Sequence, residues 1–370
     1  MEIREVAIRD FRNLRRIEER FDAGLNLIFG RNAQGKTNLL EALHMLVTGR
    51  SFRTRNEREL VPWNSEDYSA TIVRAKVQRR DGEDFYHLAF NKTQKFVSVN
   101  GDALTRLGDL VGRLNAVLFT PADLQLVQGA PSQRRRFLDI CLSQTSRLYL
   151  QALQRYDAAL RQRNAVLKMH QRKHLATELA PYNQELAASG ALIMVHRAQA
   201  LEELSALARS FYEQVAGEDE MLNVHYSPSV SSDTREESGL REKIKEALER
   251  MLPEDSTRGV TNVGPHRDDF GFRIGLRDAR DYASQGQQRT CVLALKFAEL
   301  SFLTKRRGEP PVLFLDDLMS ELDAGRRTQL LECLPREVQT FITLTERELV
   351  PGQEFGGIFE MKNGELRRVQ

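Results

Sequence analysis

Two segments that lie far apart in the sequence carry residues that could bind and hydrolyse a nucleoside triphosphate. The first is Gly30-Arg-Asn-Ala-Gln-Gly-Lys-Thr37, which fits the phosphate-loop pattern G-x-x-x-x-G-K-[ST]. In such a loop the backbone N–H groups cradle phosphate oxygens, the lysine reaches the β- and γ-phosphates, and the last hydroxyl binds Mg²⁺. The residues expected to bind ATP here are Gly30, Arg31, Asn32, Ala33, Gln34, Gly35, Lys36, Thr37 and Asn38.

The second segment, Val312-Leu-Phe-Leu-Asp-Asp317, has four apolar residues followed by two acids. This is the form of a buried strand that delivers carboxylates to Mg²⁺ and to the attacking water, although a strand that ends in a polar turn looks the same. With the loop upstream, Thr37 and Asp316 are expected to hold Mg²⁺. Lys36 would neutralise charge on the transferred phosphoryl group, and Asp317 would orient or deprotonate water.

The elements around these segments fit such a site. The apolar run 25–29 is typical of a buried strand that ends at the loop, and 38–46 has helical periodicity, which places phosphate at a helix N-terminus. A third segment, Ser284-Gln-Gly-Gln-Gln-Arg289, precedes a helix-like run and could form an anion-binding helix start. A capped surface turn is the alternative. The order of these segments is typical of an ATP-binding-cassette head: the phosphate loop comes first, then a long insert, then the Ser-x-Gly segment, and finally the acidic strand.

The chain resembles the RecF family of recombination-repair ATPases, relatives of the heads of structural-maintenance-of-chromosomes and Rad50 proteins. The segments that carry the resemblance are Asp10-Phe-Arg-Asn13, Gly35-Lys-Thr-Asn-Leu-Leu-Glu41, Gly49-Arg-Ser-Phe-Arg53, Phe119-Thr-Pro-Ala-Asp-Leu124, Gly129-Ala-Pro-Ser-Gln-Arg-Arg-Arg-Phe-Leu-Asp139, Gly264-Pro-His-Arg-Asp-Asp269, Ser284-Gln-Gly-Gln-Gln-Arg289 and Leu315-Asp-Asp-Leu-Met-Ser-Glu-Leu-Asp323. Departures are Ala33 where many relatives have Gly, Asp317 where transporter cassettes have Glu, and Thr343 and Thr345 where those cassettes place a switch His. These departures indicate slow hydrolysis.

The resemblance implies an α/β fold, an ATP-binding-cassette-type phosphate-loop ATPase head with a short helical arm domain inserted. It adds Arg12 and Asn13 to the nucleotide site. It also implies that Ser284, Gly286 and Gln287 of one subunit clamp the γ-phosphate bound by another, so that ATP joins a homodimer and hydrolysis opens it. The implied activity is that of a slow, DNA-stimulated ATPase and DNA clamp. Such a clamp dimerises on gapped DNA or on a single-strand/double-strand junction and binds both single-stranded and double-stranded DNA. It acts with RecR and RecO to help RecA load.

The expected organisation is head 1–125, helical arm 126–220 and head 221–370. Alternating segments before residue 120 predict an antiparallel sheet, and the pair Asn100-Gly101 predicts a hairpin turn. Helical periodicity fills 131–217, and Pro181 is expected at the turn of a helical hairpin. The arm is too short for a chromosome-organising coiled coil.

Composition limits the alternatives. The formal net charge is only +2, no apolar run is long enough to span a membrane, and three dispersed cysteines suggest neither disulfides nor a metal site, so we expect a cytoplasmic protein. Clustered arginines could track DNA phosphates, although a solvated surface is the more usual explanation of any one cluster. The candidate DNA contacts are Arg50, Arg53, Arg55, Arg134, Arg135 and Arg136.

Three other classes of protein compete with this interpretation. A transporter ATPase is disfavoured by the missing switch His and by the arm insert. A chromosome-structural head that tethers DNA is disfavoured by the short arm. A nuclease is disfavoured because no further acidic cluster has metal-ligand spacing.

Overall fold

The computed structural model describes residues 1–54, 56–62, 70–169, 174–216, 220–231, 236–322, 324–346 and 354–370. These residues form two compact units: unit 1 comprises Met1–Asp123 and Glu299–Gln370, and unit 2 comprises Leu124–Ala298. Residues 221–298, which the sequence analysis assigned to the head, thus cluster in the same unit as the arm 126–220. They do so because β9 (Leu222–Ser227) packs against the arm helix α5 (Leu175–Ala216) and pairs with β10 (Asp269–Ile274).

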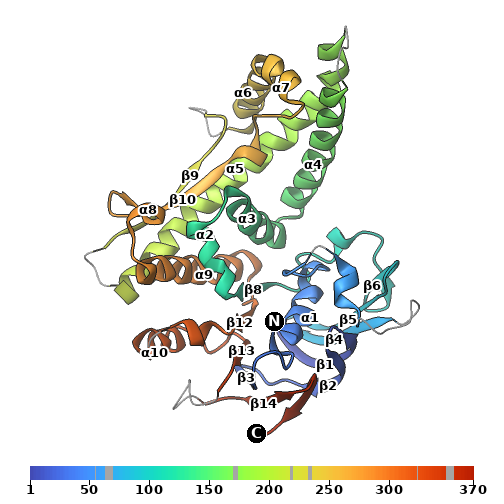
Figure 1. The fold of residues 1–370 in the computed structure, drawn as a ribbon, viewed down its shortest axis with the longest axis vertical. Coiled ribbons are helices and arrows are strands. Elements are labelled where there is room, and N and C mark those ends of the chain that lie inside the picture. The colour runs from blue at the N-terminus through green and yellow to red at the C-terminus, as the bar shows by residue number, and fades with distance from the viewer. Residues whose placement is uncertain are drawn as a thin grey trace. The chain divides into compact units, whose positions relative to one another are not determined.

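The central sheet of unit 1 is mostly parallel, with the strand order β15-β14-β3-β13-β12-β8 (Figure 1). Its strands are β3 (Leu25–Phe29), β8 (Ala116–Phe119), β12 (Val312–Asp316), β13 (Thr340–Leu344), β14 (Gly357–Lys362) and β15 (Glu365–Arg368). Every residue of β12 and β13 is buried, as expected for parallel strands covered on both faces. The register pairs Asp316 with Thr343 and Thr343 with Ile28, so the carboxyl ends of these strands share one edge. Ligands of open α/β sheets bind at this edge.

A second, antiparallel sheet in unit 1 has the order β2-β1-β4-β5-β6-β7. Its strands are β1 (Glu2–Phe11), β2 (Leu14–Arg20), β4 (Thr71–Arg79), β5 (Gly82–Phe90), β6 (Lys95–Val99) and β7 (Asp102–Ala103). Alternating burial along β4 confirms the predicted period of two. The predicted turn is confirmed as well, since Asn100 and Gly101 have φ of 55° and 88° and join β6 to β7. Helix α1 (Lys36–Thr48) contacts strands of both sheets, which explains why 39–47 are all buried.

Unit 2 is built on long helices and a small sheet, β11-β10-β9, completed by β11 (Arg277–Asp278). Besides α5, the α-helices described in unit 2 are α2 (Gln125–Gln128), α3 (Pro131–Thr145), α4 (Arg147–Lys168), α6 (Glu237–Arg250), α7 (Leu252–Arg258) and α8 (Ala279–Tyr282). Helix α9 (Gln285–Arg307) begins in unit 2 and ends in unit 1, and α10 (Ala324–Glu332) belongs to unit 1. Helices α4 and α5 lie side by side, and α6 packs on α5 (Figure 1). None of the helices described is long and apolar enough to cross a membrane.

The position of the helical reversal differs from the prediction. Helix α4 ends at Lys168 and α5 begins at Leu175, so the boundary between the two helices falls before Pro181, which lies inside α5. A proline in a helix interior costs about 3 kcal/mol because it removes a backbone donor and crowds the preceding turn. The prediction was wrong because packing of α5 along α4 outweighs that local cost.

The segment 264–269, which had no assigned role, is the centre of a buried network in unit 2. The two ring nitrogens of His266 lie 2.6 Å from Tyr156 Oη and 3.0 Å from the carbonyl oxygen of Thr261. Burial lowers the pKa of His266 to about 4, so this ring is neutral near pH 7. Gly264 has φ of 119°, and a Cβ there would lie 2.3 Å from Tyr156 Oη. These contacts indicate that the segment is structural, because they join α4 to the start of β10.

Candidate nucleotide-binding site

The phosphate loop connects the end of β3 to the start of α1 and depends on two glycines. Gly30 has φ of 154°, and a Cβ there would lie 2.3 Å from the carbonyl oxygen of Met361. Gly35 has φ of 120°, and its Cβ would lie 2.8 Å from Leu14 Cδ2. Ala33 takes the left-handed conformation, with φ of 63°, which a residue with a Cβ adopts uncommonly. This backbone conformation is the one expected of a loop whose N–H groups cradle phosphate.

Lys36 is buried inside this loop, with 7% of its surface exposed. Its Nζ donates to the carbonyl oxygens of Gly30, at 2.5 Å, and Arg31, at 3.0 Å. Burial lowers the pKa of Lys36, and the charges of Asp317 and Asp316 oppose that shift. The lysine is therefore held in the cradle by groups that phosphate oxygens could replace.

The acidic strand meets the loop through hydroxyl groups. Thr37 Oγ1 donates to Asp316 Oδ1 at 2.9 Å, and Thr343 Oγ1 lies 2.9 Å from the same oxygen. Burial raises the pKa of Asp316, and the hydrogen bonds from Thr343 and Thr37 oppose it. Residues 279 positions apart in sequence, Thr37 and Asp316, are thus brought together at the edge of the parallel sheet.

The oxygens of Thr37 and Asp316 fit the requirements of Mg²⁺. This ion prefers hard oxygen ligands in octahedral geometry at about 2.0–2.1 Å, which places neighbouring ligand oxygens about 2.9 Å apart. The separation of Thr37 Oγ1 from Asp316 Oδ1 is 2.9 Å. The pair is therefore suited to hold two adjacent positions of the ion.

Asp317 follows Asp316 in the sequence and has a left-handed backbone conformation. Its φ is 49°, in the left-handed region, and its N–H donates to Thr343 Oγ1 at 2.9 Å. Ser320 Oγ donates to Asp317 Oδ1 at 2.7 Å. The carboxylate is held at the end of β12, at the same sheet edge as the phosphate loop, where an attacking water would be needed.

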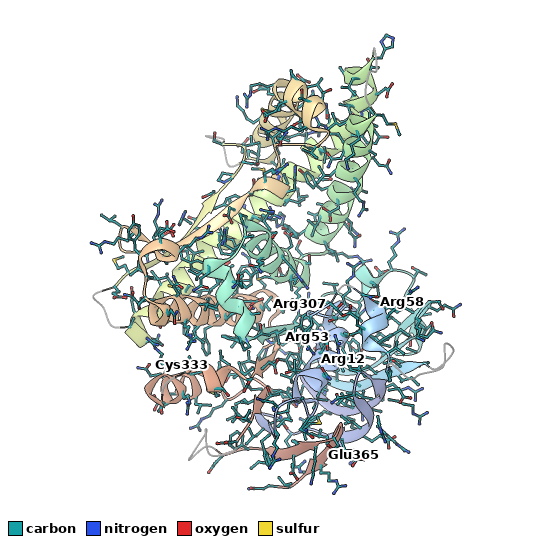
Figure 2. The ribbon with its side chains drawn as sticks, in the orientation of Figure 1. Arg12, Arg53, Arg58, Arg307, Cys333 and Glu365 are labelled. Carbon is teal, nitrogen blue, oxygen red and sulfur yellow. The ribbon has the colours of Figure 1, made fainter. Side chains whose placement is uncertain are left out.

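A buried glutamate connects the loop helix to two predicted site arginines. Arg12 forms a bidentate pair with Glu41, at 2.5 and 2.8 Å, and Arg53 lies 3.5 Å from the same carboxylate. Figure 2 labels the two arginines, which lie near each other in unit 1. Glu41 is fully buried. Among the other predicted DNA contacts, Arg50 is exposed, whereas Arg55 lies outside the described residues. Glu41 stands in one of the family motifs, but no role was predicted for it, since its partners are distant in sequence.

A chain of hydrogen bonds leads from Arg53 to the loop. Arg53 donates to Asn38 Oδ1 at 2.7 Å, Asn38 donates to Asn13 Oδ1 at 2.7 Å, and Asn13 donates to the carbonyl oxygen of Ala33 at 3.3 Å. The side chain of Arg12 is instead occupied by Glu41 and by the carbonyl oxygen of Glu59. Asn13 thus contacts the loop, whereas Arg12 is bound to Glu41 of α1, and direct nucleotide contact by either residue stays a prediction.

The Ser-x-Gly segment lies in unit 2, at the start of α9. Gln287 N donates to Ser284 Oγ at 3.2 Å, and Ser284 N donates to Gln287 Oε1 at 2.9 Å. This reciprocal pair of hydrogen bonds is a capping box, in which Ser284 caps the helix. The backbone N–H groups near Gly286 lie in the first turn, where a helix offers them no carbonyl partner. Gln287 also donates to Glu220 at 2.6 Å. The clamp across a dimer stays a prediction.

The second arginine cluster, 134–136, lies partly inside unit 2. Arg134 is 4% exposed and forms a bidentate pair with Asp269, with both distances 2.7 Å. Arg135 donates to the carbonyl oxygen of Asp268 at 2.7 Å, whereas Arg136 is exposed. DNA contact by Arg134 would require its bidentate ion pair with Asp269 to break, so Arg134 is not expected to contact DNA.

This fold and this site define a phosphate-loop ATPase head of the ATP-binding-cassette type. The chain matches the family described as RecF/RecN/SMC N terminal domain over residues 2–367. It is 46% identical to the DNA replication and repair protein RecF of Symbiobacterium thermophilum, covering 91% of this chain and 90% of that protein. It superposes with a TM-score of 0.91 and 36% identity on a structure described as the recombination mediator protein RecF-ATP in the RecFOR pathway, covering 100% and 97% of the two chains. The chain belongs to the RecF family, as its motifs predicted.

A more distant likeness concerns the fold alone. An Smc head bound to the C-winged helix domain of ScpA superposes with a TM-score of 0.58 at 14% identity, covering 100% of this chain and 97% of that one. The predicted fold class, a head of this type with a short helical arm inserted, is confirmed.

Proposed function

We propose that this protein is an ATP-dependent DNA-binding clamp of recombinational gap repair. The observation that carries the proposal is the contact of 2.9 Å between Thr37 of the phosphate loop and Asp316 of the acidic strand, with Asp317 next to it. The names of its relatives, a DNA replication and repair protein and a recombination mediator with bound ATP, support the biological context.

In the proposed reaction the chain binds ATP through the loop N–H groups and Lys36. The lysine exchanges the carbonyl oxygens of Gly30 and Arg31 for the β- and γ-phosphates. Thr37 and Asp316 would hold Mg²⁺, which when bound neutralises charge on the phosphates. Asp317 orients the attacking water and accepts its proton, because its carboxylate is fixed by Ser320 at the strand end.

The proposed clamp is a homodimer that needs ATP to close. The start of α9, with Ser284, Gly286 and Gln287, would bind the γ-phosphate held by a second copy, since N–H groups at a helix start favour anions. Hydrolysis removes the shared ligand, so the dimer opens and releases DNA. We propose that hydrolysis is slow, that DNA stimulates it, and that it times the release.

The proposed DNA partner is a gapped duplex with its single-stranded region. Arg50, Arg53 and Arg136 are exposed and can contact the backbone, which positions the protein without reading bases. The proposed protein partners are RecR and RecO, with RecA loaded afterwards in the cytoplasm. The RecFOR pathway of the relative with bound ATP supports this choice.

The variant Lys36→Ala tests the role of ATP in the dimer. Because a hydrogen bond to a charged group contributes about 1.5–3 kcal/mol, ATP binding should weaken about 10- to 100-fold. Analytical ultracentrifugation should show that a non-hydrolysable ATP analogue produces a dimer of the unmodified protein, whereas Lys36→Ala stays monomeric at the same analogue concentration. Lys245→Ala, on the exposed surface of α6, is the matched control. A Lys36→Ala dimer that forms equally well would contradict the proposal.

A further inference from the structure

Thr343 lies on the strand next to the two predicted acids of the nucleotide site and contacts both of them. It is the fourth residue of β13, is fully buried, and stands opposite Asp316 in the parallel pairing with β12. The residues beside it on the strand, Ile342 and Leu344, are apolar and belong to the core. In the sequence, Thr343 is distinguished only by standing where transporter cassettes place a switch His, and no role was predicted for it.

The hydroxyl of Thr343 can serve both acids at once. A hydroxyl donates one hydrogen bond and accepts others. Its Oγ1 lies 2.9 Å from Asp316 Oδ1, to which it donates, and it accepts the N–H of Asp317 at 2.9 Å. The carbonyl oxygen of Leu315, at 3.4 Å, is a longer and weaker alternative acceptor. One buried side chain therefore fixes a carboxylate and the backbone of the next residue.

These two bonds set different parts of the site. Asp316 Oδ1 is held on one side by Thr37 and on the other by Thr343, so the carboxylate cannot turn away from the phosphate loop without losing one of them. Asp317 has φ of 49°, a conformation that is uncommon for residues with a Cβ. Its N–H bond to Thr343 stabilises that turn and thereby the direction of its side chain.

We infer that Thr343 is a positioning residue for the nucleotide site, which aligns Asp316 with Thr37 and fixes the turn that presents Asp317. This inference rests on the proposed function, because it assumes that Asp316 and Thr37 hold Mg²⁺ together with the nucleotide. Partners that orient metal ligands from behind change metal affinity or activity by about 10- to 100-fold when removed. Thr343 stands in that relation to Asp316.

Thr343→Val tests the inference because valine keeps the shape and removes only the hydroxyl. Thr340→Val is the matched control, since Thr340 is also buried on β13 but donates to the carbonyl oxygen of Val338, away from the acids. The measurement is binding of a fluorescent ADP, titrated with Mg²⁺ and compared with binding in EDTA. Thr343→Val should need about tenfold more Mg²⁺ for half-maximal enhancement, whereas Thr340→Val and Thr343→Ser should match the unmodified protein.

A second pair of variants tests the inference if Thr343→Val does not fold. Thr343→Ser and Thr343→Ala both lack the methyl group and differ only in the hydroxyl. The serine variant should therefore show the Mg²⁺ dependence of the unmodified protein, whereas the alanine variant should need about tenfold more Mg²⁺. In steady-state hydrolysis at saturating Mg²⁺, alanine should lower kcat and leave KM for ATP unchanged. Equal Mg²⁺ dependence of alanine and serine would overturn the inference. Absence of Mg²⁺-dependent ADP binding in the unmodified protein would instead overturn the proposed function.

Discussion

The variant Asp317→Asn should hydrolyse ATP about 10²- to 10⁴-fold more slowly than the unmodified protein, because a positioned general base contributes about that much. Asparagine has the same size and tolerates the left-handed conformation, with φ of 49° at this position. Its Oδ1 can still accept the hydrogen bond of Ser320. ATP binding should therefore remain, and the dimer should stay closed. Phosphate release measured at saturating ATP, with the dimer followed in parallel, gives both quantities.

Asp278→Asn is a matched control for this experiment. Asp278 caps the short helix α8 by accepting the N–H of Arg280, and it belongs to unit 2, outside the phosphate loop and the acidic strand. Its replacement should leave hydrolysis unchanged. If Asp317→Asn hydrolysed ATP as fast as this control, Asp317 would not be the residue that activates water.

Arg163→Met should be the most destabilising of the variants considered. Arg163 and Asp255 are both fully buried in unit 2 and form an ion pair at 2.7 Å, and Arg163 also donates to Asn183 and Thr261, each at 2.7 Å. Removing one partner of such a pair leaves an uncompensated charge and costs about 3–5 kcal/mol. Calorimetry should show a corresponding fall in the melting temperature of unit 2.

The loss of stability should come from the buried charge of Asp255, which is left without its partner, and not from the loss of the arginine side chain itself. The double variant Arg163→Met with Asp255→Leu should therefore recover most of the stability, since apolar residues of similar volume replace buried ion pairs at little cost. Arg161→Met, at an exposed position two residues away on α4, should be neutral. A double variant as unstable as Arg163→Met would show that the pair is not the cause.

The elements that depend on residues close together in the sequence were predicted correctly. The phosphate loop, the strand before it and the helix after it are specified by neighbouring residues, and the hairpin turn at Asn100 and Gly101 follows from their tolerance of positive φ. The family was predicted for the same reason, because its motifs are contiguous. The contact between Thr37 and Asp316 was predicted because a phosphate loop and an acidic strand are known to form one Mg²⁺ and nucleotide site together.

What failed or was missed depends on contacts between distant residues. Pro181 was placed at a turn because local cost was weighed without the packing of α5 on α4. The ion pair of Arg134 with Asp269 joins residues far apart in sequence, so all three arginines of 134–136 were predicted to be available to DNA. Glu41 and Thr343 act on partners that arrive from other strands. A single sequence gives no sign of such partners.

The most direct test of the proposed clamp is DNA binding with and without a non-hydrolysable ATP analogue. Fluorescence anisotropy should compare a gapped duplex with a fully paired duplex at one fixed salt concentration, because phosphate contacts make affinity depend on salt. The analogue should strengthen binding to the gapped duplex about 5- to 150-fold in the unmodified protein and have no effect on Lys36→Ala. Equal affinity with and without the analogue, or no binding to either DNA, would contradict an ATP-gated DNA clamp.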